Sequence, residues 1–300
     1  MVPKPILKWV GGKTQILNVI FKKFPENMEN YHEPFLGGGS VLFNLLYRIR
    51  QGEITVNNIY ASDSNEALIG LYINIQNWYM ELYNDILYFV DEFKKIERLN
   101  GGSRDPQTPE ESLFSQESYY YFIRRLYNET TDKTSIRASA LFIFLNKTCF
   151  RGLYRVGPHG FNVPFGNNRN PEIINLQHLK EINELIQGVV FNCCDFTTAL
   201  NLVEYGDFVY LDPPYIPVTK TSFVGYTPDG FDKHETLLES LEKAKYNFLM
   251  SNSDSGLIKN RFNYESITAK RNINSKNPGA VVREILVTNL ICTTSILNTC

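Results

Sequence analysis

The residues most suited to carry out chemistry form the run Asp212-Pro213-Pro214-Tyr215, which follows an apolar segment at residues 207–211. Two successive prolines have no N–H to donate and cannot continue a central strand, but their carbonyl groups can still accept hydrogen bonds. A carboxylate, a carbonyl and an aromatic ring at a strand end suit a planar amino group, with two acceptors and a stacking face. The alternative is a proline turn with a packed tyrosine, and the preceding strand makes it the weaker interpretation. No other residue of the sequence is an obvious partner for Asp212.

A glycine-rich turn at residues 33–40 reads Glu-Pro-Phe-Leu-Gly-Gly-Gly-Ser, between a predicted strand and a predicted helix. Glycines allow a sharp turn and a close approach to a ligand, and the following helix adds N–H donors. No GxxxxGK[ST] motif follows, so a triphosphate cradle is not expected. Asp63 ends the next predicted strand, where a carboxylate can bind both hydroxyls of a ribose. Together they predict an adenosyl ligand without pyrophosphate. A turn that binds nothing is the alternative.

The charge of the chain is unevenly distributed, although the net charge is only −2. Residues 81–118 carry nine acidic and four basic side chains, whereas residues 119–171 carry eight basic and two acidic ones. Residues 259–283 add six basic side chains and one acidic one. The two basic segments could form one footprint for a polyanion, and an ordinary solvated surface is an equally good explanation from charge alone.

The composition excludes several classes of protein. With 43% hydrophobic and 21% charged residues in 300, the chain is neither disordered nor a disulfide-stapled miniprotein. Its five cysteines show no CxxC spacing and its four histidines are scattered, so we expect a reducing compartment and no metal site. No apolar run reaches the roughly 18 residues of a membrane span, and the first residues do not resemble a signal peptide. We therefore expect a cytoplasmic location.

Hydrophobic periodicity predicts an α/β domain interrupted by a mostly helical, basic insertion. We expect helices at residues 15–24, 41–49, 67–96, 119–127 and 135–145, and strands at 31–35, 54–61, 188–192, 207–211, 247–251, 266–271 and 284–290. Residues 148–171 combine glycine, proline and asparagine with aromatic and arginine residues, which indicates irregular, functional structure.

The motifs, taken in order, resemble those of DNA adenine-N6 methyltransferases of the Dam type. Residues 7–13 (Leu-Lys-Trp-Val-Gly-Gly-Lys) match the N-terminal signature, residues 33–40 the S-adenosylmethionine loop, and residues 212–215 the catalytic motif. Residues 145–147, 150–155 and 160–166 match the segment with which this family reads DNA. The resemblance spans residues 7–287, and several independent motifs in the right order make a chance match improbable.

The resemblance implies a Rossmann-like methyltransferase sheet with helices on both faces, plus a mostly helical target-recognition insertion. It divides the chain into a catalytic domain, residues 1–95 and 188–300, and a DNA-recognition insertion, residues 96–187. The methyl donor would be S-adenosyl-L-methionine, leaving S-adenosyl-L-homocysteine, and no metal would be required. The implied catalytic residues are Asp212, Pro213, Pro214 and Tyr215. The implied donor-binding residues are Trp9, Lys13, Phe35, Gly37, Gly39, Ser40, Asp63, Asp195, Phe196 and Asp212.

In the implied reaction, adenine in double-stranded DNA flips out of the helix and is methylated at N6. Trp9 would lie against the adenine of the donor, Lys8 and Arg155 would reach guanine edges, and Phe150 would wedge into the base stack beside Arg151. The full set of implied DNA-binding residues is Lys8, Lys147, Phe150, Arg151, Leu153, Arg155, Pro164, Asn167 and Asn168.

GATC is the first candidate for the recognised sequence. Arg151, Asn167 and Asn168 differ from the residues expected in the bacterial GATC enzyme, which bears on the sequence read more than on the reaction. The resemblance also allows a partner restriction endonuclease and a bacterial or viral origin. Two alternatives remain from the sequence: methylation of an amino group in RNA or of a protein glutamine, and a non-catalytic DNA-binding relative that kept the fold.

Overall fold

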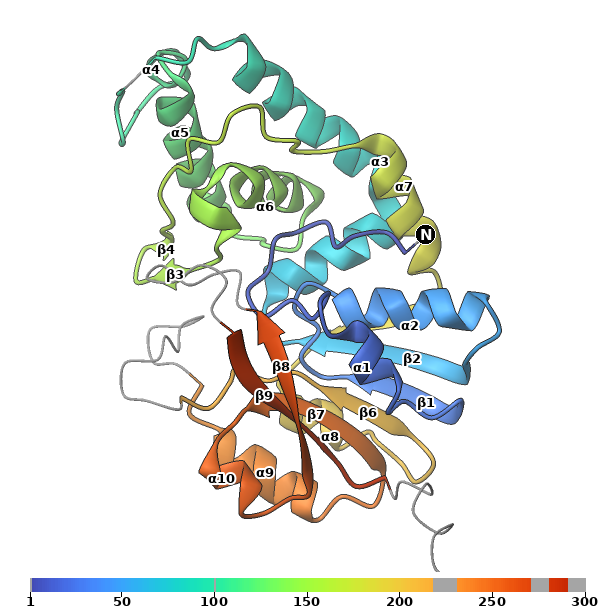
Figure 1. Cartoon of the computed structure of the whole chain (residues 1–300). Coiled ribbons are helices and arrows are strands. Elements are labelled where there is room, and N and C mark those ends of the chain that lie inside the picture. The colour runs from blue at the N-terminus through green and yellow to red at the C-terminus, as the bar shows by residue number, and fades with distance from the viewer. Residues whose placement is uncertain (1, 100, 218–230, 271–280, 291–300) are drawn as a thin grey trace, which may run out of the picture.

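A computed structural model describes residues 2–99, 101–217, 231–270 and 281–290. Within these ranges the main sheet has seven strands in the order β5-β2-β1-β6-β7-β9-β8 (Figure 1). The strands are β1 (Asn27–Glu33), β2 (Thr55–Asp63), β5 (Val189–Cys193), β6 (Phe208–Leu211), β7 (Asn247–Ser253), β8 (Tyr264–Lys270) and β9 (Val281–Thr288). The first five in this order are parallel, and β9 is antiparallel to both β7 and β8. The predicted α/β class is confirmed.

Each face of the sheet has its own hydrophobic core, because side chains alternate along a strand. Tyr31 and Tyr210 belong to the core that includes residues of α1 (Leu17–Phe21), α2 (Ser40–Arg50) and α3 (Glu66–Lys95). Val209 and Leu211 belong to the core on the other face, with α8 (Phe196–Leu200), α9 (His234–Glu242) and α10 (Gly256–Lys259). Helices therefore cover both faces, as a Rossmann-like sheet requires.

The chain leaves the sheet after β2 and returns at β5, and the residues between them form the helical upper part of Figure 1. This part contains α4 (Pro109–Ser112), α5 (Gln116–Glu129), α6 (Ile136–Thr148), the 3-10 turn η1 (Phe150–Gly152), the short strands β3 (Val156–Gly157) and β4 (Gly160–Phe161), and α7 (Leu176–Leu185). The Ser115 and Ser135 hydroxyls cap α5 and α6, which explains where these helices begin. The buried α6 packs against α3.

The predicted ends differ from the structure by one to four residues in most elements, and one case has a clear cause. The helix predicted for residues 15–24 is only one turn, Leu17–Phe21, and the strand predicted for residues 31–35 is Asn27–Glu33. Polar residues at Asn27, Glu29 and Asn30 hid the start of this strand, since its exposed positions tolerate them. Arg271 and Lys276, two of the six basic residues of the segment 259–283, lie outside the described residues. In the described part of the chain, no helix has the length and apolar character of a membrane span.

Candidate active site and nucleic-acid interface

The strand order reverses between β1 and β6, because the chain runs outward from β1 through β2 to β5 and later resumes at β6. Ligands of open α/β sheets bind at such a switch point, beyond the carboxyl ends of the strands. Glu33 ends β1 and Asp212 follows β6, so two carboxyl groups lie at this point. Tyr31 and Tyr210 come two residues before Glu33 and Asp212, and both tyrosines belong to the core on the face of α1 and α2. Because residues two positions apart on a strand share a face, the two carboxyl groups lie on that face as well.

Asp212 is paired with Lys13, which corrects the expectation that this carboxylate has no partner in the chain. The Lys13 Nζ donates to Asp212 Oδ2 at 2.6 Å and to the Gly11 carbonyl at 2.6 Å. Lys13 is only 4% exposed, and its ammonium lies 5.0 Å from the centre of the Tyr215 ring. Burial raises the pKa of the Asp212 carboxyl, and the charge of Lys13 opposes that rise. A pair separated by 199 positions leaves no signal in the local sequence.

Glu33 is a second carboxyl of the site, which the prediction from sequence did not include. Its side chain is 2% exposed and accepts a hydrogen bond from the Tyr31 hydroxyl at 2.7 Å. Burial raises the pKa of Glu33 to about 8, and the charge of Asp212 adds to the rise. Glu33 is therefore largely protonated at neutral pH. Its position directly before the glycine turn is the sequence feature that could have identified Glu33 as a site residue.

Close packing against Trp9 and Tyr72 explains the three consecutive glycines. A Cβ atom on Gly38 would lie 2.9 Å from the Trp9 Cβ, and one on Gly39 would lie 2.8 Å from the Tyr72 hydroxyl. Gly37 and Gly39 also have φ values of 50° and 71°, which favour glycine. The indole of Trp9 stacks on Tyr154, with ring centres 5.3 Å apart. The turn is thus held next to the N-terminal segment.

The other predicted donor-binding residues lie at the ends of neighbouring strands. Asp63 accepts hydrogen bonds from the backbone N–H groups of Gly37 and Asn65, both at 3.0 Å, and so anchors the glycine turn to β2. Asp195 caps α8 beyond β5 through the Thr197 N–H at 2.9 Å. The rings of Phe35 and Phe196 stack with their centres 5.5 Å apart. Ser40 begins α2, and its hydroxyl accepts from the Lys13 N–H at 3.2 Å.

The Asp-Pro-Pro-Tyr run is fixed by side chains from two neighbouring strands. The Ile216 N–H donates to Asn252 Oδ1 at 3.1 Å, and the Ser253 hydroxyl donates to the Ile216 carbonyl at 2.6 Å. Glu284 on β9 accepts a hydrogen bond from the Tyr215 hydroxyl at 3.0 Å. Pro213 and Pro214 have no N–H, so these contacts replace the ladder bonds that the run cannot make. The sequence prediction missed Glu284.

One amide connects the N-terminal segment with the predicted DNA-reading segment. The Asn146 side chain accepts from the Lys8 N–H at 2.9 Å and donates to the carbonyl groups of Lys8 at 2.9 Å and Gly152 at 3.1 Å. Asn146 is fully buried, so three backbone groups depend on it. We call this arrangement the Asn146 clamp. In the sequence, Asn146 belongs to the motif at residues 145–147, and no role was predicted for it.

Several predicted DNA-contacting residues gather after the clamp, between α6 and α7. Phe150 is 44% exposed, and the Arg151 guanidinium lies 5.1 Å from the centre of its ring. Arg151 has a φ of 59°, a conformation that residues other than glycine rarely adopt and that is often found at functional sites. Lys147 is half-buried and Leu153 packs against the core. Burial, together with the charge of Lys8, lowers the pKa of Lys147.

Asparagines hold two arginines at this surface. Arg155 donates from Nε to Asn162 Oδ1 at 2.6 Å and from Nη2 to the Asn162 carbonyl at 3.1 Å. Arg98 donates from Nη2 to the carbonyl and the side-chain oxygen of Asn167, at 2.7 and 2.6 Å. Neither Asn162 nor Arg98 was among the predicted site residues. Pro164 is exposed and Asn168 half-buried on the same segment.

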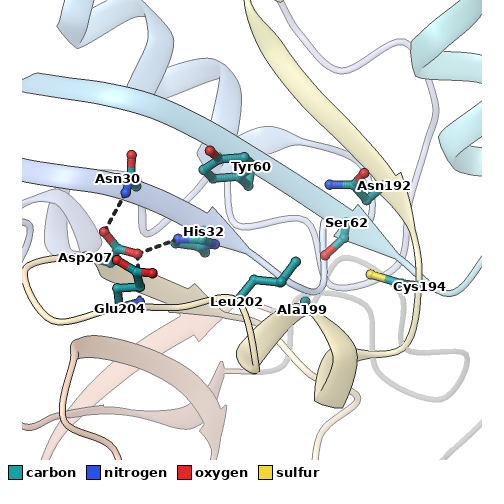
Figure 2. Close-up of a pocket in the computed structure, with 10 residues that line it drawn as sticks. All are labelled: Asn30, His32, Tyr60, Ser62, Asn192, Cys194, Ala199, Leu202, Glu204 and Asp207. Carbon is teal, nitrogen blue, oxygen red and sulfur yellow. Dashed lines mark hydrogen bonds and ion pairs between the residues drawn. The ribbon is translucent and has the colours of Figure 1, made fainter.

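A cavity of about 440 Å³ lies on the other face of the sheet, beside α8 (Figure 2). Its most buried groups are His32 and Asp207, whose side chains are 2.9 Å apart, and Asn30 donates to Asp207 at 2.8 Å. His32 and Glu33 are adjacent on β1, so their side chains point to opposite faces of the sheet. The cavity therefore lies on the face opposite to Glu33 and Asp212. None of the predicted site residues lines it. The chemistry of the switch point, and not the size of this hollow, identifies the candidate active site.

Comparison with known proteins gives consistent matches over nearly the whole length. A family model described as D12 class N6 adenine-specific DNA methyltransferase matches residues 9–275. The type II methyltransferase M.MjaIII of Methanocaldococcus jannaschii is 36% identical over 293 residues, covering 92% of this chain and 94% of the relative. A DNA adenine methylase of Haemophilus influenzae is 30% identical over 289 residues, covering 92% of this chain and 89% of the relative. The resemblance drawn from the motifs is confirmed.

Proposed function

Because the chain belongs to the D12 class N6 adenine-specific DNA methyltransferase family, we propose that it methylates adenine at N6 within a specific sequence of double-stranded DNA, with S-adenosyl-L-methionine as donor. The observation that carries this proposal is the position of Asp212 and Tyr215 at the switch point, next to the glycine turn. A carboxylate and an aromatic ring there can hold one amino group and its base. We place this activity in the cytoplasm.

The residues around the switch point fit a donor of this chemistry. Carboxyl groups lie at the ends of four neighbouring strands, at Glu33, Asp63, Asp195 and Asp212. The last three suit the ribose hydroxyls, ammonium and sulfonium of the donor, whereas Glu33 is largely protonated. The stacked rings of Phe35 and Phe196 would lie beside the donor adenine, together with Trp9, and Lys13 would reach its carboxylate. Gly37, Gly39 and Ser40 would allow its close approach. When bound, S-adenosylmethionine supplies an activated methyl group on a good leaving group.

The target adenine must leave the duplex to reach Asp212, at a cost of a few kcal/mol. We propose that Phe150, exposed and flanked by Arg151, fills the gap in the base stack. Tyr215 then stacks on the flipped base. Asp212 Oδ1 and the Pro213 carbonyl accept the two N6–H bonds, since Asp212 Oδ2 is engaged by Lys13. Pro214 has no N–H to donate to a neighbouring strand, so residues 212–215 do not continue β6.

Holding both N6–H groups makes the amino nitrogen more pyramidal and directs its lone pair at the methyl group. The bound donor would supply its methyl group to this nitrogen, with the N6–carbon bond forming as the sulfur–carbon bond breaks, and its sulfur would become neutral. The positive charge passes to N6, which then gives one proton to the Asp212 carboxylate. Burial favours this transfer because it raises the pKa of Asp212. Positioning supplies most of the rate.

We propose that residues 96–187 form the recognition insertion and residues 1–95 and 188–300 the catalytic domain. Lys8 and Arg155 would contact guanine edges, with Lys147, Leu153, Pro164, Asn167 and Asn168 along the same surface. An arginine that binds guanine O6 and N7 is the most common specific contact, which supports GATC as the candidate sequence. Because M.MjaIII is named a type II methyltransferase, a partner restriction endonuclease is part of this proposal.

Transfer of a labelled methyl group to DNA, RNA and protein tests the proposal, followed by sequencing of the DNA for N6-methyladenine. We expect label in double-stranded DNA alone, at one short sequence. Label in RNA or in protein glutamine would identify the other methyltransferase activity. DNA binding without any label would identify a non-catalytic relative. Methylation at a sequence other than GATC would leave the reaction in place and correct only the site.

A further inference from the structure

We propose that Glu284 is a positioning residue, which holds the Tyr215 ring in the orientation that stacks on the target base. This inference rests on the role proposed for Tyr215. Glu284 lies on β9 and is half-buried, and its Oε2 accepts the Tyr215 hydroxyl at 3.0 Å. Tyr215 itself lies outside any strand or helix. A side chain of the rigid sheet therefore fixes an aromatic ring on an irregular segment.

The location of Glu284 suits this purpose. It pairs with Ser253 at the end of β7, and Ser253 in turn binds the Ile216 carbonyl at 2.6 Å. Two adjacent residues across the β7–β9 pair thus hold the backbone and the ring of the same segment. The hydrogen bond to Glu284 restricts rotation of the ring about its side-chain bonds, since it fixes the position of the hydroxyl at the far end of the ring. The Lys13 ammonium also lies near this ring, 5.0 Å from its centre.

Glu284 also gives the ring a chemical advantage. A phenol that donates to a carboxylate becomes richer in electrons, and its face attracts positive charge more strongly. Positive charge develops on the adenine as N6 gains the methyl group, so the stacked ring stabilises the transition state more than the substrate. Glu284 acts here through Tyr215 and does not touch the reacting atoms.

A double-mutant cycle tests the inference. We expect Glu284→Ala to lower the single-turnover methylation rate at saturating DNA and donor by about 10- to 100-fold, as loss of a hydrogen bond to a charged group should. Tyr215→Phe should lower the rate similarly, and Glu284→Ala should cause little further loss in the Tyr215→Phe background. Glu284→Gln keeps an acceptor and should restore part of the rate. Glu265→Gln, on the neighbouring strand and paired with Lys23, should behave as the wild type.

Stacking can be measured separately with 2-aminopurine in place of the target adenine. Its fluorescence is quenched by a stacked aromatic ring, so Glu284→Ala and Tyr215→Phe should give a brighter complex than the wild type. A loss of stability alone would not produce this signal, and Tyr215→Phe tests it if Glu284→Ala does not fold.

Two results would overturn the inference while wild-type methylation stands. One is an unchanged rate in Glu284→Ala. The other is a loss of equal size with and without the Tyr215 hydroxyl. A wild-type protein that methylates no DNA would instead contradict the proposed function.

Discussion

At the scale of single residues, the ion pair between Asp212 and Lys13 decides how the proposed catalytic carboxylate can be tested. We expect Asp212→Ala to abolish methyl transfer. It also removes the negative charge that faces the buried Lys13 ammonium, a loss of about 3–5 kcal/mol of stability. Asp212→Asn keeps the shape and should be as inactive with a smaller loss. Radiolabelled transfer to DNA, together with thermal melting of each variant, checks both statements. Near wild-type turnover in Asp212→Asn would contradict the assigned role.

Trp9 offers a second test at this scale, because the protein has only two tryptophans. Trp9 packs on Tyr154 and the glycine turn, whereas Trp78 is 52% exposed at a kink in α3. We expect the methyl donor to quench the fluorescence of Trp9, since its adenine would lie against the indole. A titration with donor should show quenching in Trp78→Phe and none in Trp9→Phe. The reverse pattern would make Trp9 a structural residue only.

At the scale of elements, the β3–β4 hairpin presents Arg155 already oriented by Asn162. We expect Arg155→Ala to cost ~1–3 kcal/mol of discrimination at one base pair and to relax the recognised sequence there. Lys147→Ala should weaken binding to all sequences alike, with a salt dependence lower by about one phosphate contact. The measurement is methylation of every single-base variant of the site across a salt series.

An equal loss on all substrates for Arg155→Ala would show that it contacts only the backbone of DNA. In that case the base-reading residue should be sought among Lys8, Arg151, Asn167 and Asn168. The same substrate set answers this question without a new assay.

The seven strands of the main sheet and the helices α1, α2, α3, α5 and α6 were predictable from the sequence, whereas α7, α9 and the long-range polar contacts were not. The strand before Asp212 and the helix that begins at Ser40 follow from local hydrophobic patterns and glycine chemistry. The clamp made by Asn146 and the bond from Tyr215 to Glu284 join residues 138 and 69 positions apart. Their pairing is decided by the order of the strands, which periodicity alone does not give. The polar start of β1 was missed because exposed strand positions carry no hydrophobic signal.

At the scale of the whole molecule, Glu33 makes stability depend on pH. Its pKa rises from an ordinary 4.5 to about 8 in the folded protein, so the folded form binds the proton more tightly than the unfolded chain. The stability it contributes is complete below pH 4.5 and is lost as the pH rises through about 8. Glu33→Gln cannot ionise and should therefore lose less stability than the wild type between pH 5 and pH 8, by roughly a few kcal/mol.

Urea denaturation of both proteins at several pH values measures this difference, with Glu265→Gln as the control for an exposed carboxylate. Parallel stability curves for the wild type and Glu33→Gln would contradict the assignment of a buried, protonated Glu33. Divergent curves in the opposite direction would do the same.

The Asn146 clamp has a consequence for fidelity. It ties the backbone of Lys8 to that of Gly152, and only five positions separate Lys8 from Lys13, which holds Asp212. If Lys8 contacts DNA as proposed, a DNA sequence that does not bind Lys8 should therefore also leave the proposed catalytic carboxylate misplaced. We expect an incorrect DNA site to dissociate from the protein before it is methylated. Discrimination would then come from slow methylation of incorrect sites and not from weak binding to them. Such an enzyme would bind DNA tightly at any sequence and still methylate very few adenines outside its recognised sequence.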